Sequence, residues 1–127
     1  MIFESIHHIA IISSDYHKAK DFYVNKLGCR VKNEVERKDK EDYIITLEAP
    51  GEIEIELFIK KDAPKRVTYP EALGLRHLAF YVEDINKAVE ELRKRGIETE
   101  GIRLDPINGK HMTFFFDPDG LPLEIHE

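Results

Sequence analysis

The chain carries one pattern twice, and this internal repeat constrains its fold more than any other feature. Residues 6–28 read IHHIAIISSDYHKAKDFYVNKLG, and residues 75–96 read LRHLAFYVEDINKAVEELRKRG. The two segments align over their full length with the loss of one residue, so the offset falls from 69 to 68 positions. Equivalent pairs are His8 with His77, Ala10 with Ala79, Asp15 with Asp84, and Gly28 with Gly96. Such a repeat indicates two copies of one supersecondary unit.

Each copy is predicted to be a strand followed by a capped helix. In the second copy, apolar residues run almost without interruption from Leu75 to Val82, which is typical of a strand buried on both faces. Apolar residues then recur three and four positions apart, which defines one face of a helix. They are Ile85, Ala88, Val89 and Leu92. Asp84 stands at the N-cap position, and Gly96 stands where the helix should end.

Three more strands are predicted after each helix. In the first half, a strand at 3–13 and a helix at 15–27 precede strands at 30–37, 43–48 and 52–60. In the second half, the further strands are 98–104, 110–116 and 122–126, with a tight turn at 117–120. We therefore expect an α+β chain of paired βαβββ modules, module one at 1–60 and module two at 75–127, forming one domain. The segment 61–74, which contains proline and glycine, is the expected linker.

Composition limits the classes of function that are open to the chain. Apolar residues make up 42% of the sequence, and the net charge of −6 argues against nucleic acid or an anionic membrane as the main partner. No apolar run approaches the length of a membrane span, and the sequence enters a strand at once, so we expect no signal peptide. Cys29 is the only cysteine; we expect it to be buried, in a cytoplasmic protein without intrachain disulfides.

Each half also carries one histidine on its first strand and one glutamate on its last. These residues are His8, Glu56, His77 and Glu124. If a pseudo-twofold axis relates the halves, the four side chains can converge on one point. Two imidazoles and two carboxylates suit a divalent transition metal, and an octahedral ion would keep two positions for water or substrate. One of the carboxylates could also act as a base.

The alternative for each of these residues taken alone is structural. A single histidine on a strand is more often a hydrogen-bonded core residue, and a single glutamate is usually a solvated charge. Their repetition at equivalent positions favours the metal site. We expect His7 to point away from His8, and Glu52 and Glu54 to lie at the rim or in solvent. Of the remaining histidines, only His111 is kept as a pocket candidate.

Four motifs along the chain resemble the glyoxalase I / vicinal oxygen chelate superfamily, and the resemblance covers essentially the whole sequence. They are HHIAI, FYVNKLG, GLRHLAF and DPDGLPLEI. The resemblance implies paired βαβββ modules around a divalent metal (nickel, zinc or cobalt), with ligands at His8, Glu56, His77 and Glu124. In glyoxalase I the metal chelates two neighbouring substrate oxygens and stabilises an enediolate while a ligand glutamate moves the proton. Carried over, Glu124 is the expected base and Glu56 the second catalytic carboxylate.

The sequence also departs from glyoxalase I. Those enzymes usually have an arginine four residues after the first histidine, which holds a glutathione carboxylate, and this chain has Ile12 there. Basic residues elsewhere could bind an anionic substrate instead. They are Lys61, Lys65, Arg66, Arg103 and Lys110. The resemblance therefore supports the metal site more strongly than it supports the use of glutathione as the thiol cofactor.

The function expected first is that of a lactoylglutathione lyase-type enzyme, which isomerises a 2-oxoaldehyde–thiol hemithioacetal through a metal-bound enediolate. One alternative is another metalloenzyme of the superfamily, either an epimerase or a thiol transferase. Methylmalonyl-CoA epimerase normally has glutamine at the second ligand position, so Glu56 favours the glyoxalase-like branch. Another alternative is a metal-free ligand-binding protein of the bleomycin-resistance type. Exposed sheet edges predict a homodimer, with the site formed within one chain or between two.

Overall fold

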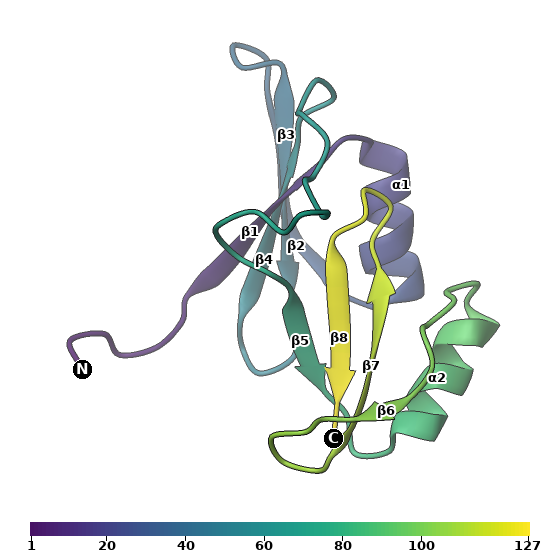
Figure 1. Ribbon diagram of the computed structural model, residues 1–127. Helices are drawn as coiled ribbons and strands as arrows, with labels where there is room; N and C mark the ends of the chain where they lie inside the picture. Colours follow the sequence, from purple (N-terminus) through teal and green to yellow (C-terminus); the bar gives the residue numbers. More distant parts are fainter. The chain divides into compact units, whose positions relative to one another are not determined.

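The computed structural model describes residues 1–127, and its contacts divide the chain into two units, Met1–Pro64 and Lys65–Glu127. Each unit contains one four-stranded sheet and one helical segment (Figure 1). No helix has both the length and the apolar character that crossing a membrane requires. The α+β class and the repeated βαβββ order are confirmed.

The first unit has its four strands in the order β1-β4-β3-β2. Strand β1 (His8–Ser13) runs parallel to β4 (Glu54–Ile59), and the other neighbours are antiparallel. The remaining strands are β2 (Arg30–Arg37) and β3 (Asp42–Glu48). Helix α1 (Tyr16–Lys20) continues into a π-helix, η1 (Asp21–Lys26), and Figure 1 shows the two as one coil.

The second unit repeats this topology, with the strand order β5-β8-β7-β6. Strand β5 (Leu78–Tyr81) runs parallel to β8 (Pro122–His126), and antiparallel pairing adds β7 (His111–Phe116) and β6 (Arg103–Leu104). Helix α2 (Ile85–Lys94) contacts β8. Each first strand therefore pairs with the last strand of its own unit, so segments that are distant in sequence become neighbours.

One face of each sheet, together with its helix, forms the core of that unit. In the first unit, alternate residues of β3 and β4 are buried, and so are the aromatic residues Phe22 and Tyr23 of the helical segment. The most buried are Tyr23, Ile45, Leu47, Ile55 and Leu57. In the second unit they are Ile85, Phe115 and Leu123. Cys29 is buried as expected, and burial raises the pKa of its thiol.

Three of the expected elements differ from the structure. The strand expected at 3–13 begins at His8, and the preceding residues are exposed. The strand expected at 75–82 is limited to β5 and is not buried on both faces, because its residues alternate between half-buried and exposed. The strand expected at 98–104 keeps only its last two residues, and the Thr113 hydroxyl lies within hydrogen-bond distance of the carbonyls of Glu100 and Gly101, which precede them.

Both helical segments begin at an aspartate, as the repeat predicts. A side-chain oxygen of Asp15 accepts from the Lys18 amide at 2.9 Å, and one of Asp84 accepts from the Lys87 amide at 3.1 Å. Gly96, which follows α2, has a φ of 80°, a conformation that side chains other than glycine rarely adopt.

Replacing Asp84 with alanine is expected to lower the free energy of unfolding by about 1 kcal/mol, because the first turn of α2 loses its capping acceptor. Urea denaturation followed by circular dichroism measures the change. Asp84→Asn is the matched control, since asparagine removes the charge but keeps an acceptor at the N-cap. Equal losses in both variants would show that charge, and not capping, matters at this position.

Asp42 is a buried carboxylate in the first unit. Its Oδ1 accepts from Arg37 Nε at 2.7 Å, and its Oδ2 accepts from Lys60 Nζ at 2.8 Å. The hydrogen bonds from Arg37 and then from Lys60 hold the pKa of Asp42 far below its ordinary value of 3.8. The ionised carboxylate therefore stabilises the folded state at neutral pH, and this contribution is lost as the pH falls toward the folded-state pKa.

We expect Asp42→Asn to be less stable than the wild-type protein at neutral pH, and the difference to shrink below about pH 4. The reason is that the Asp42 carboxylate of the unfolded wild-type chain takes up a proton below about pH 4 while the folded protein keeps it ionised, so unfolding of the wild-type protein becomes progressively more favourable. Urea midpoints measured across this pH range test the expectation. A difference that does not change with pH would mean that shape, and not charge, accounts for the loss.

Candidate metal centre

The strand register places one histidine beside one glutamate in each unit. On the parallel pair β1 and β4, Ala10 lies opposite Glu56, and His8 lies two residues earlier on the same face. On the parallel pair β5 and β8, Ala79 lies opposite Glu124, and His77 again lies two residues earlier. The two His–Glu pairs therefore occupy equivalent positions in the two sheets.

In each pair, the imidazole Nε2 faces a carboxylate oxygen. The distance is 3.3 Å from His8 to Glu56 Oε2 and 2.9 Å from His77 to Glu124 Oε2. The second pair is the less exposed: the Glu124 side chain is 8% exposed, whereas that of Glu56 is 27% exposed. The second unit therefore holds the shorter and more shielded of the two pairs.

The second nitrogens of the two histidines have different surroundings. Nδ1 of His8 lies 2.9 Å from Nδ1 of His7, so His7 does not point away from His8 as expected. The reason is that His7 precedes the first residue of β1, where strand alternation begins. Nδ1 of His77 is buried and has no hydrogen-bond partner, while the His77 ring meets Phe114 edge-on at 5.0 Å.

The donor atoms fit a divalent transition metal. Facing imidazole nitrogens and carboxylate oxygens can share either a proton or a cation, and both donors suit nickel, cobalt or zinc. The unpartnered Nδ1 of His77 is a further buried nitrogen without a role inside the protein. Within neither unit do three or more His, Cys, Asp or Glu side chains cluster to hold a metal ion alone. Each unit thus supplies a two-residue half of the predicted ligand set.

The other histidines and acidic residues have different partners. His111 Nδ1 lies 3.0 Å from Glu127 Oε1, and His126 Nε2 lies 3.0 Å from Asp105 Oδ2. Glu54 pairs with Lys32 at the surface. His111 is not among the residues that line the pocket described next.

A pocket of about 190 Å³ lies beside His77 and is lined only by residues of the second unit. Its walls combine arginines with aromatic rings, and Phe114, which contacts His77, is one of them. Sequence analysis did not single out Phe114. The signal was the phenylalanine run 114–116, in which alternate residues share one face. Phe114 pairs across the sheet with Glu124, which places it on the face of the His–Glu pair.

The fold and the repeated pairs define the class of protein. The chain belongs to the Glyoxalase/Bleomycin resistance protein/Dioxygenase superfamily, whose family model matches residues 5–125. Members of this superfamily bind small molecules, often use divalent metals and often dimerise.

Individual relatives agree with this assignment. The chain is 58% identical to the uncharacterized protein YwkD of Bacillus subtilis, over all of this chain and 99% of that protein. The crystal structure of a glyoxalase family protein from Enterococcus faecalis is 54% identical, with a TM-score of 0.95 and full coverage of both chains. Human mitochondrial methylmalonyl-CoA epimerase is 28% identical, over 96% of this chain and 73% of the enzyme.

Proposed function

We propose that the protein is a metal-dependent glyoxalase I-like lyase of the lactoylglutathione lyase type. Its substrate would be the hemithioacetal of a 2-oxoaldehyde and a thiol, and its product the thioester of the corresponding 2-hydroxy acid. The observation that supports this proposal is the pair of His–Glu contacts at equivalent register positions in the two units. A duplicated pair is hard to explain by packing alone, because neither histidine is fully buried in a core.

His8, Glu56, His77 and Glu124 would together hold one nickel, zinc or cobalt ion. The ion would supply Lewis-acid stabilisation of negative charge on neighbouring substrate oxygens when bound.

Glu124 is the proposed general base. It would take the proton from the substrate carbon that carries sulfur and hydroxyl and return it to the adjacent carbonyl carbon, while the hydroxyl proton passes to the former carbonyl oxygen, so that the isomerisation gains and loses no atom. Its small exposure supports this role, because a shielded carboxylate exchanges the transferred proton less readily with bulk water. Glu56, which is more exposed, would serve as the second carboxylate.

Removing the metal is expected to abolish turnover of the methylglyoxal–glutathione hemithioacetal, and adding nickel, cobalt or zinc is expected to restore it. The experiment treats the purified protein with a chelator, titrates each metal back, and follows thioester formation by absorbance. Metal content measured by mass spectrometry accompanies each assay. An absence of activity with all three metals would rule out this substrate.

The second candidate function is that of an epimerase, which the relationship to human methylmalonyl-CoA epimerase favours. Epimerisation also needs a carboxylate that removes a proton next to a carbonyl, so Glu124 would have the same task. The substrate distinguishes the two functions. An epimerase would catalyse the exchange of solvent deuterium into a branched acyl-CoA ester, which NMR can follow. It would leave the hemithioacetal unchanged.

We also propose that the protein forms a homodimer. Strands β1 and β5 are edge strands, and each exposes a large apolar side chain, Ile12 or Tyr81. Exposed edges and apolar residues of this kind favour association with another chain. Light scattering on the purified protein would distinguish a dimer of about twice 14.8 kDa from a monomer.

A further inference from the structure

We infer that the pocket beside His77 recognises an anionic group of the substrate, a carboxylate or a phosphate, through Arg66, Arg76 and Arg103. All three arginines line the pocket together with His77. The inference extends the proposed function, on which it rests for the position of the reacting end of the substrate. It also selects among the basic residues considered from sequence, because Lys61, Lys65 and Lys110 do not line this pocket.

Arg66 supplies a positive charge that no carboxylate neutralises. Its guanidinium donates to the backbone carbonyls of Arg76 at 2.9 Å and of Leu75 at 3.3 Å, and Arg66 forms no ion pair. These two bonds hold the planar group in place and leave its charge uncompensated. An arginine in this state is suited to binding an oxyanion, since its remaining N–H groups match a carboxylate or phosphate edge.

The other two arginines have only weak carboxylate partners. Arg76 contacts Glu71 at 2.8 Å and Arg103 contacts Glu100 at 3.4 Å, with all four side chains well exposed. Exposed ion pairs contribute little to stability, so a ligand anion can replace either glutamate at small cost. Since Glu71 and Glu100 also line the pocket, its charged walls carry three arginines against two glutamates.

Phe114 connects this cationic wall to the candidate metal centre. The Arg103 guanidinium lies 5.3 Å from the centre of the Phe114 ring, and the His77 ring meets the same phenylalanine. An anion held by the arginines would therefore lie in the same pocket as His77. The volume of about 190 Å³ is below the range of about 300–1,000 Å³ that is usual for whole drug-sized ligands. The pocket thus suits a small anionic group and not a nucleotide.

The test measures binding of small anions to chelator-treated protein, so that neither metal nor turnover is required. The probes are succinate, inorganic phosphate and uncharged succinamide, titrated while backbone amide signals are followed by NMR. We expect succinate or phosphate, but not succinamide, to shift the amides of Arg66, Arg103 and Phe114. The stronger of the two anions identifies the group that is recognised.

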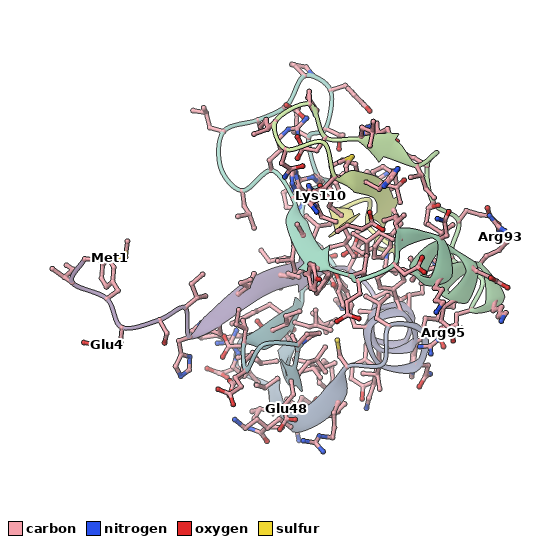
Figure 2. The ribbon with its side chains drawn as sticks, turned by 90° about the horizontal axis from the view of Figure 1, so that it is seen from below. Met1, Glu4, Glu48, Arg93, Arg95 and Lys110 are labelled. Atoms are coloured by element: carbon pink, nitrogen blue, oxygen red, sulfur yellow. The ribbon has the colours of Figure 1, made fainter.

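Three arginine variants with a matched control complete the experiment. Arg66→Gln and Arg103→Gln are each expected to weaken anion binding by about tenfold or more. Arg76→Gln supplies a third variant should Arg66→Gln disturb the loop whose carbonyls it contacts. Arg93→Gln makes the same change of charge on the outer side of α2, where Figure 2 shows Arg93 pointing away from the rest of its unit, and should leave binding unchanged.

Several results would overturn the inference. They are the absence of binding by both anions, equal binding of succinamide, and equal weakening by Arg93→Gln and the pocket variants. These results are independent of the proposed lyase activity, which could persist on an uncharged substrate. Conversely, loss of the lyase proposal in the metal assay would leave anion binding by the metal-free protein intact.

Discussion

Replacing Glu124 with glutamine is expected to lower the kcat of metal-dependent isomerisation by about 10²–10⁴-fold. The substitution keeps the size and shape of the side chain but removes its ability to accept a proton. Glu124 is the less exposed of the two paired carboxylates and lies 2.9 Å from His77. The measurement is steady-state kinetics on the hemithioacetal, with the metal content of each preparation determined in parallel.

Two further variants make this result interpretable. Glu56→Gln is expected to reduce activity less, because glutamine retains an amide oxygen for metal binding and Glu56 is not the proposed base. Glu48→Gln is the matched control, since Glu48 pairs with Arg30 on the surface and should leave kcat unchanged. Equal losses in Glu56→Gln and Glu124→Gln would contradict the assignment of a single base. Full activity of Glu124→Gln would remove Glu124 from the chemistry.

Phe115→Ala is expected to lower the free energy of unfolding by about 3–5 kcal/mol. Phe115 lies on β7 and is 1% exposed, so its removal leaves a cavity in the core of the second unit as well as losing buried apolar surface. A loss of this size is a large part of the stability of about 5–15 kcal/mol that is usual for a folded domain. Urea denaturation, monitored by circular dichroism, measures the change.

The neighbouring phenylalanine supplies the control. Phe116 lies on the opposite face of β7 and is 43% exposed, so Phe116→Ala removes the same atoms with a much smaller loss of stability. Similar losses in the two variants would show that both faces of β7 are buried in solution, for example by association with a second chain.

Much of the fold could be predicted because the same sequence pattern occurs in both halves of the chain. The alignment of His8 with His77 and of Asp15 with Asp84 fixes the start of each strand–helix unit, and the capping contacts confirm both aspartates. The predicted strand boundaries were less accurate where the hydrophobic pattern of a segment does not decide how that segment packs against other segments. Apolar residues at 75–82 suggested a fully buried strand, but burial depends on what packs against each face of the sheet, and alternate residues of β5 are exposed.

The candidate site also has a part that could be predicted from the sequence and a part that could not. The equivalent positions of the histidines and glutamates could be predicted from the repeat, but the contact of each histidine with the glutamate of its own unit depends on the pairing of the first strand with the last. The pocket could not be predicted, because its lining extends from Arg66 to Pro122 and depends on which loops return to the sheet face. Phe114 and Arg76 were missed for this reason, and Lys61, Lys65 and Lys110 were considered without a pocket to place them in.

The sequence by itself determined the repeated βαβββ order, the helix caps and the repeat-equivalent positions of the two histidines and the two glutamates. These features follow from periodicity and spacing along the chain, which set which face of a strand a side chain occupies. Only the tertiary structure decided the greater shielding of the Glu124 pair, the contact of His77 with Phe114 and the gathering of three arginines around one small pocket. The physical reason is that burial and side-chain contacts depend on segments that are distant in sequence. The local sequence pattern does not specify which distant segments will meet.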